Sequence, residues 1–324
     1  MASTKASLQA LVLEAAAING AETCTLRQKD ISAMIDAASH RSLLLAADAS
    51  TKAHMALSSV PGAGVWLTAP PCQDGREMDA ALFRIAAKRR IRCPTPFSEA
   101  PCPCCGQILD IWGDHALVCP CQGDRTVRHN TLRNIGCEEA GAAGLRPERE
   151  RAGLLPGRPT ADGAPPVATA RRPADIWVPR GPSGGNTAFD FGVTCGMQAA
   201  CMRQAAEDPQ SLIVEYEEKK KQHLNTKEAC RTVGLRFTPR IVAAHAGGLS
   251  QTTRGVIDWI AASLAAAKGS DKAGEALRIA QRISIALHRE NARAILRRIP
   301  AAEPQDAASS AWANSHDAHE VHNA

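Results

Sequence analysis

The sequence is poor in aromatic residues and has no long hydrophobic run. Phe, Trp and Tyr make up only 3% of its 324 residues, so any core must be built from aliphatic side chains. No run of about 18 apolar residues occurs, and this absence argues against a membrane-spanning helix. Segment 6–20 is interrupted by Glu14 and has no convincing cleavage site, unlike a secretory leader. We therefore expect a soluble intracellular protein without membrane contact.

The charge and length of the chain set further limits. Lys and Arg outnumber Asp and Glu, which gives a formal net charge of +5. Such an excess suits a polyanionic partner but is too small to require one. A hydrophobic content of 44% over this length permits two compact domains.

The cysteines are clustered rather than spread in pairs along the chain. Of the twelve, five lie between Cys102 and Cys121, and His115 belongs to the same stretch. Clustering of soft ligands is typical of a metal site, whereas a disulfide framework is typical of small secreted proteins. The remaining cysteines are scattered, and we expect them to be reduced.

The cluster has the spacing of a structural zinc site. Cys102 and Cys105 form a Cys-x2-Cys turn, in which Gly106 relieves backbone strain after the second ligand. His115 and Cys119 are four residues apart and share one face of a helical turn. These four ligands form a closed tetrahedral set, so the predicted zinc has a structural role.

Two alternatives remain open for this cluster. Cys121 is an alternative to Cys119 as the fourth ligand, and Cys104 is a spare thiol. The other interpretation is a cysteine-rich loop that binds no metal.

Hydrophobic spacing predicts a mixture of helices and strands, of the α+β or α/β class. Helical periodicity covers 1–60, 78–92, 124–140, 197–230 (with a break at Asp208-Pro209), 252–267 and 272–298. Strand patterns cover 145–155, 175–178, 187–194 and 237–244, and the turn 181–186 predicts a hairpin between the second and third of them. Segment 156–170 is a linker rich in proline, glycine and alanine.

These patterns suggest a division of the chain into five regions. We expect a helical region at 1–100, a zinc knuckle at 101–122, a domain with a mixed sheet at 123–250, C-terminal helices at 251–299 and a disordered polar tail at 300–324.

Two aspartates lie at the edges of the strands predicted to form the hairpin. Asp175 begins the first strand and Asp190 lies within the second. If the strands pair, both carboxylates can converge on one hard divalent cation such as Mg2+. A lysine is then needed to stabilise charge on a phosphate, and segment 215–224 offers several. The competing interpretation is a pair of turn acids beside a solvated helix with pairs such as Glu217 with Lys221.

The order of these motifs resembles the restriction-like endonuclease region of site-specific non-LTR retrotransposons. The likeness covers 102–244: the Cys-Cys-His-Cys knuckle, Arg128-His129-Asn130, the strand that begins at Pro173-Ala174-Asp175, the motif Asp190-x-x-Val-Thr and a lysine-bearing helix. Weaker likeness extends to 62–68 and 288–298. Each motif alone is weak, but their order and spacing together are fairly specific.

The resemblance implies a PD-(D/E)XK fold that nicks target DNA. Asp175 and Asp190 would hold Mg2+, and Lys220 would be the catalytic lysine, since it shares a helical face with His223 and Lys227. Further carboxylates would come from Glu138, Glu139 or Glu150, and Arg128-His129-Asn130 would position nucleic acid or serve the structure. The implied location is nuclear and the implied partner is DNA, with element RNA and the oligomeric state left open.

The chain departs from the family pattern at three points. Ala174 separates Pro173 from Asp175, and Gly192 stands where a lysine is expected two residues after Asp190. No aromatic-Ala-Asp-Asp sequence occurs, so the polymerase itself is missing. The alternative function is therefore a catalytically inactive, zinc-stabilised remnant that binds nucleic acid.

Overall fold

A four-stranded mixed sheet lies at the centre of the protein. The computed structural model describes residues 27–72, 74–95, 100–157 and 172–299. The strands are β1 (Glu148–Arg149), β2 (Ile176–Val178), β3 (Thr187–Thr194) and β4 (Arg236–Ala243), in the order β1-β2-β3-β4. β2 is antiparallel to both β1 and β3, whereas β3 and β4 are parallel. The mixed α/β class predicted from the sequence is confirmed.

Helices surround this sheet. In chain order those of the described residues are α2 (Gln28–Ala46), α3 (Ala49–Ser58), the 3-10 helix η1 (Val65–Thr68), α4 (Ala80–Arg90), α5 (Asp114–Val118), α6 (Asp124–Ala142), α7 (Ala199–Glu207), α8 (Pro209–Gln222), the 3-10 helix η2 (His223–Asn225), α9 (Thr226–Thr232), α10 (Gln251–Lys268) and α11 (Lys272–Leu296).

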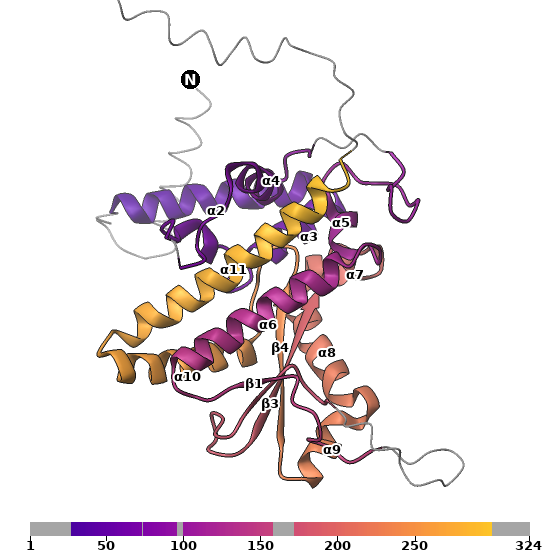
Figure 1. Cartoon of the computed structure of the whole chain (residues 1–324). Coiled ribbons are helices and arrows are strands. Elements are labelled where there is room, and N and C mark those ends of the chain that lie inside the picture. The colour runs from indigo at the N-terminus through magenta and orange to yellow at the C-terminus, as the bar shows by residue number, and fades with distance from the viewer. Residues whose placement is uncertain (1–26, 73, 96–99, 158–171, 300–324) are drawn as a thin grey trace, which may run out of the picture.

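The two faces of the sheet are covered by different helices (Figure 1). Phe189 and Phe191 of β3 point into a core shared with α6, α10 and α11. Asp190 and Gly192 alternate with them and therefore face the other side, where α8 lies. This alternation places a carboxylate of β3 under the lysine-bearing helix.

Most predicted elements occur within a few residues of their expected bounds. The strand expected at 145–155 is shorter, because only Glu148–Arg149 pairs with β2. The helical stretch expected at 197–230 consists of α7, α8 and α9, and α8 begins where the Asp208 side chain caps the backbone N–H groups of Gln210 and Ser211. The predictions for 1–26, for 158–171 and for the tail at 300–324 lie outside the described residues.

The cores cross the predicted region boundaries. Ile260 of α10 and Leu287 of α11 pack in the same cluster as Phe189, so the C-terminal helices complete the sheet's core. A second cluster joins α3, α4, the cysteine-rich segment, α7 and the end of α11. The apolar stripes of these helices are buried against one another and against the sheet, which is the physical reason for the continuity.

Helix α6 approaches β3 closely at a glycine. A Cβ atom on Gly136 would lie 2.6 Å from Phe191 Cζ and 3.0 Å from Arg240 Nη1. Gly141, on the same helix, is exposed, and its nearest neighbour would be Pro147 Cγ at 3.9 Å. Alanine at Gly136 therefore tests a packing requirement, whereas alanine at Gly141 tests helix propensity alone.

We expect Gly136→Ala to lower the free energy of unfolding by about 1–3 kcal/mol, because the added methyl group overpacks the contact with Phe191. Gly141→Ala should leave it unchanged or raise it by up to about 1 kcal/mol through helix propensity. Urea unfolding followed by circular dichroism measures both. Equal effects of the two substitutions would contradict the packing role of Gly136.

Candidate functional site

Asp175 and Asp190 lie on neighbouring strands. Asp175 immediately precedes β2, whose first residue, Ile176, pairs with Phe189 of β3. The carboxylate of Asp175 accepts hydrogen bonds from the Phe191 backbone N–H at 2.6 Å and from His129 Nε2 at 3.1 Å. The negative charge of Asp175 contributes to raising the pKa of Asp190, although burial is the larger cause. The hairpin thus brings the two predicted acids into one electrostatic environment.

Lys220 completes this group from helix α8. Its Nζ lies 2.9 Å from Asp190 Oδ2. The neighbouring Lys221 instead pairs with Glu218 at 2.5 Å. Of the lysines considered at the end of this helix, Lys220 is therefore the one that contacts Asp190.

Gly192 allows α8 to pack closely against β3. A Cβ atom at this position would lie 2.7 Å from Tyr216 Cε1 and 2.6 Å from Ile241 Cδ1. A lysine in the strand would therefore clash with α8. Tyr216 and Lys220 are four residues apart on one face of α8, so the helix that excludes a side chain at 192 also supplies the amine.

The charges within the group are coupled. Burial is the largest cause of the raised pKa of Asp190, and the ammonium of Lys220 opposes it. For Lys220, burial lowers the pKa but Asp190 outweighs it, so the pKa of the amine is raised above its usual value. Lys220 is thus an ammonium, and with both acids ionised the carboxylates outnumber it. The group would attract a cation.

A cavity of about 350 Å³ adjoins the group. Lys220 and His129 line it, as do Tyr216 and the exposed Arg125. Pro120 and Gly123 extend the lining to the end of the cysteine-rich segment. Arg125 and Tyr216 were not predicted as site residues. For Tyr216, the sequence contained one indication of a place in the site: it lies four residues before Lys220 on the same helix.

The Arg128-His129-Asn130 motif divides into different roles. The guanidinium of Arg128 is buried and donates to Asn291 Oδ1 at 2.8 Å and to the Leu117 carbonyl at 3.0 Å. Burial lowers its pKa to about 10. Arg128 therefore ties α6 to its neighbours, which favours the structural one of the two roles expected for it, although it also lines the cavity. His129 contacts Asp175, and Asn130 is half-buried.

The further carboxylates considered from the sequence are engaged elsewhere. Glu139 accepts from both Arg278 and Arg282, and Glu138 accepts from Arg282, so both face α11. The backbone N–H of Glu150 donates to the Asp175 carbonyl at 2.8 Å. Its carboxylate, however, pairs with Arg133 and Arg172. Each of these acids has a guanidinium partner, so none matches Asp190 as a cation ligand.

Helix α8 also differs from the solvated helix that the sequence left as an alternative. Glu217 is buried, and its carboxylate accepts from Thr252 Oγ1 at 3.2 Å. The expected pair of Glu217 with Lys221 is replaced by the pair of Lys221 with Glu218. One side of α8 therefore packs against the sheet and α10, while the other carries the exposed charges.

A second group of potential ligands lies in the cysteine-rich segment. The donor atoms of Cys102, Cys105, His115 and Cys119 all lie within 4.8 Å of one another. Sulfur atoms bound to one tetrahedral Zn2+ ion are about 3.8 Å apart, given a Zn–S bond of roughly 2.3 Å. The Cys3His group could therefore hold zinc. It includes Cys119 and does not include the alternative ligand Cys121.

Local backbone geometry prepares this group for a metal. Gly106 has a φ of +75°, a conformation that favours glycine, and its N–H donates to the Cys102 carbonyl at 2.9 Å. Burial is the largest single influence on Cys102 and opposes its ionisation. Hydrogen bonds from the backbone N–H groups of Cys104 and Cys105, together with those from the side chains of His115 and Cys105, outweigh burial and lower the pKa of this thiol to about 6. The thiolate is the form that binds metals.

Two aspartates anchor the helix that carries His115. Asp110 precedes α5, and its carboxylate accepts a hydrogen bond from the backbone N–H of His115 at 2.6 Å. Asp114 accepts from Arg89 at 3.0 Å and from Arg92 at 2.7 Å. The histidine is therefore positioned by polar contacts on both sides, which connect the segment to α4.

A scan against models of known protein families finds no match to this chain, and a search of curated proteins also finds none. Within the described residues, none of the helices has the length and apolar character needed to cross a membrane. The functional assignment consequently depends on the geometry of the two ligand groups.

We expect the purified chain to bind about one Zn2+ ion through the Cys3His group. Cys105→Ser should abolish this binding because it removes a donor, whereas Cys104→Ser, one residue away and outside the group, should retain it. Zinc released by a thiol-modifying reagent can be measured with a colorimetric chelator. Equal zinc content in the two variants would show that the ligand set is wrong.

Proposed function

We propose that this chain is a divalent-metal-dependent DNA endonuclease, related to the restriction-like endonuclease region of non-LTR retrotransposon polyproteins. The observation that carries the proposal is the convergence of Asp175, Asp190 and Lys220 beside a cavity. Such enzymes use two carboxylates to hold a metal ion and a lysine to stabilise negative charge at the scissile phosphate. The order of motifs along the chain supports the same family.

The acidic pair suits a hard cation such as Mg2+. Each carboxylate oxygen of Asp175 accepts one hydrogen bond, and a carboxylate has about four acceptor positions in all, so capacity remains on both oxygens. Asp190 is largely buried, and Lys220 is its one ion-pair partner among the described residues. A cation held by Asp175 and Asp190 would supply Lewis-acid polarisation of a phosphate oxygen.

The remaining side chains have complementary roles in this proposal. Lys220 is an ammonium that stabilises negative charge on the phosphate. His129 and the Phe191 N–H fix the orientation of the Asp175 carboxylate. Arg125 lines the adjoining cavity and is placed to bind a neighbouring phosphate.

We also propose that the Cys3His group is a structural zinc knuckle that orders the region beside the cavity. Zn2+ with three thiolates and a neutral imidazole carries a net negative charge. Arg298 is fully buried nearby and bonds to Asp124 at 2.6 Å. Burial lowers its pKa, but Cys119 and Asp124 outweigh burial and raise it. The guanidinium of Arg298 would offset the negative charge of the zinc-bound knuckle. It would also connect the knuckle to Asp124 at the start of α6, beside the cavity.

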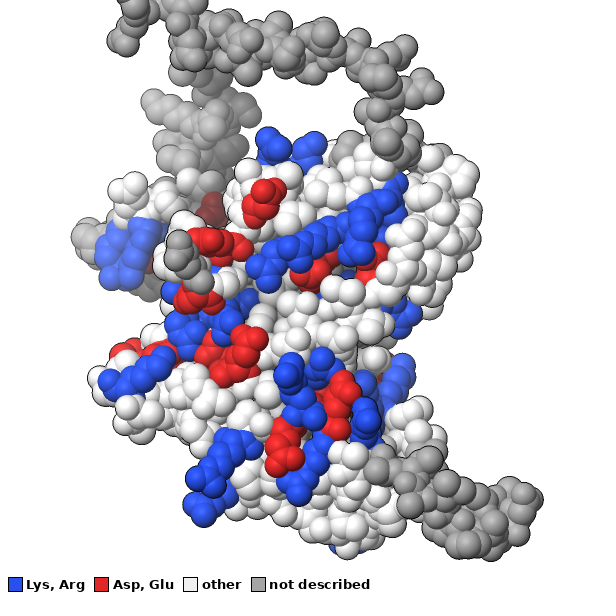
Figure 2. All heavy atoms as spheres, in the orientation of Figure 1, with Lys and Arg blue, Asp and Glu red and all other residues white. Residues whose placement is uncertain are grey.

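The surface charge is compatible with a nucleic-acid partner. Figure 2 shows a band of basic side chains across the upper part of this face, over α11. Arg289, Arg293 and Arg297 follow one another at intervals of four residues on that helix. Side chains at this spacing form one ridge, which phosphate groups can contact without reading the bases.

We expect Asp175→Asn, Asp190→Asn and Lys220→Gln each to lower the rate of Mg2+-dependent plasmid nicking by roughly a hundredfold or more, because each removes a charge at the scissile phosphate. Lys219→Gln is the matched control, since Lys219 is exposed on the same helix. Circular dichroism should show a retained fold in all four variants.

The outcomes separate the proposal from its alternative. Nicking that is unaffected in the aspartate variants would exclude the catalytic assignment. Salt-sensitive DNA binding by the native chain without any metal-dependent nicking would instead identify an inactive, zinc-stabilised nucleic-acid-binding remnant.

The pH dependence of nicking should reflect Asp190. Burial raises its pKa above the ordinary aspartate value, so the carboxylate becomes protonated at a higher pH than usual as the solution is acidified. Protons and Mg2+ would compete for this group, so the rate should fall on acidification and the fall should move to lower pH as Mg2+ is increased. Nicking rates across an acidic-to-neutral series at two Mg2+ concentrations measure this. An acid limb that is independent of Mg2+ would contradict the ligand role.

A further inference from the structure

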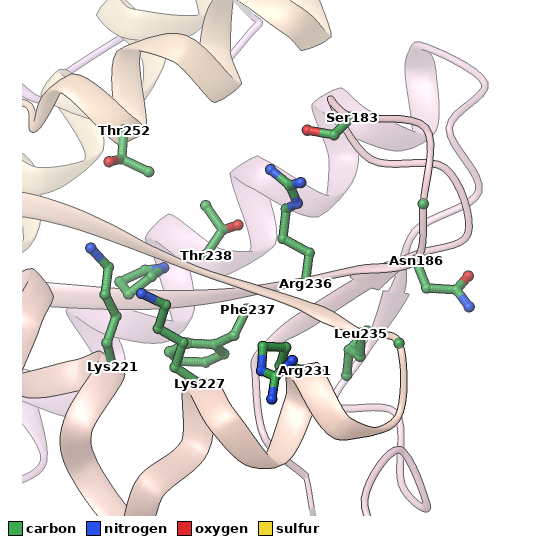
Figure 3. Close-up of a pocket in the computed structure, with 13 residues that line it drawn as sticks. Ser183, Asn186, Lys221, Lys227, Arg231, Leu235, Arg236, Phe237, Thr238 and Thr252 are labelled. Atoms are coloured by element: carbon green, nitrogen blue, oxygen red, sulfur yellow. The ribbon is translucent and has the colours of Figure 1, made fainter.

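A second and larger cavity lies on the other side of the lysines of α8. Its volume is about 650 Å³, and it is bounded by the end of α8, by α9, by the start of β4 and by the turn between β2 and β3 (Figure 3). The cations that line it are Lys221, Lys227, Arg231 and Arg236. We call it the α8–α9 cavity.

The cations of this cavity are only partly neutralised. Lys221 pairs with Glu218, and Arg231 pairs with Glu228. Lys227 and Arg236 are exposed and form no ion pair with a carboxylate of the described residues. In Figure 3 the side chains of Lys221, Lys227 and Arg236 extend toward the side where Thr252 and Ser183 lie, whereas Arg231 points away. The cavity therefore presents an excess of positive charge next to hydroxyl groups.

The walls are suited to phosphate groups rather than to bases. Ser183 and Thr238 contribute hydroxyl donors, which phosphate oxygens accept, whereas the hydroxyl of Thr252 already donates to Glu217. The aromatic residue of the lining, Phe237, is buried in a core cluster with Leu235 and is not free to stack on a base. A ligand held here would be recognised by its negative charge and not by its sequence.

The position of the cavity relates it to the acidic pair. Lys220 contacts Asp190 and lines the first cavity, while the next residue, Lys221, lines the second. Consecutive residues of a helix point in directions about 100° apart, so the end of α8 separates the two cavities. A strand with one phosphate beside Lys220 can continue past the end of α8 toward Lys221 and Lys227.

We propose that the α8–α9 cavity binds the phosphodiester backbone of the nucleic acid on one side of the site at Lys220. The contacts are independent of sequence and involve Lys227 and Arg236 above all. This inference rests on the proposed function only for the class of ligand, because it concerns binding and not cleavage. Nicking by the native chain tests the proposed endonuclease function. The DNA affinity of variants that lack these charges tests the proposed role of the cavity.

The experiment measures the anisotropy of a labelled duplex DNA of mixed sequence with the full zinc-loaded chain carrying Asp175→Asn, so that no cleavage interferes. We expect Lys227→Gln/Arg236→Gln to weaken binding by roughly tenfold or more at moderate salt. The slope of log affinity against log salt should fall by roughly 1.8, about 0.9 for each lost phosphate contact. Unchanged melting curves should accompany this loss, since both side chains are exposed.

The matched control is Arg84→Gln/Lys88→Gln on α4, which removes the same charges from exposed positions at the other end of the molecule. Affinity and salt slope in this control should remain near those of the parent. An equal loss in both double variants, or no loss in Lys227→Gln/Arg236→Gln, overturns the proposal. Inorganic pyrophosphate and a free nucleotide distinguish a strand from a small ligand. A defect confined to these small ligands, with DNA affinity unchanged, also overturns it.

Discussion

The contact between α8 and β3 at Gly192 is the constraint on which the candidate site depends. With no side chain at this position, Tyr216 packs against the strand, and Lys220, one turn further along, reaches Asp190. The pairing of β2 with β3 brings Asp175 to the same place, where the Phe191 backbone and His129 hold its carboxylate. The register of β2 on β3, the close packing at Gly192 and the face of α8 that carries Lys220 together bring Asp175, Asp190 and Lys220 to one place.

The rest of the molecule maintains this arrangement through packing. Phe189 and Phe191 anchor β3 in the core beneath α6, α10 and α11, so the strand that carries Asp190 is fixed on one face while its acid is presented on the other. The end of α11 reaches the cysteine-rich segment, where Arg298 contacts Asp124 at the start of α6. Helix α6 in turn carries His129. The two ligand groups are thus connected through α6 and α11, even though they are far apart in the sequence.

The electrostatics of the site follow from this burial. Asp190 more than offsets the burial of the Lys220 ammonium, whereas Lys220 offsets only part of the burial of Asp190, whose pKa stays raised. The same arrangement leaves an excess of negative charge for a hard cation, and the cations of the two adjoining cavities provide positive potential for a polyanion. In the proposed function, the acidic pair would hold the metal ion and the surrounding cations would contact the phosphodiester substrate.

Spacing along the chain was sufficient to predict the Cys3His group, because a tight turn and a helical turn bring residues three and four positions apart onto one ion. The turn at 181–186 was sufficient to predict the β2–β3 hairpin. The sequence also indicated Asp175, Asp190 and Lys220 as candidates. Their meeting could not be derived from the sequence, since it depends on how α8 packs on β3, and neither could the burial of Arg128 or the capture of Glu138 and Glu139 by arginines of α11. Local periodicity determines which side chains share an element, whereas the choice of partner between distant elements is made by the packing of the complete core.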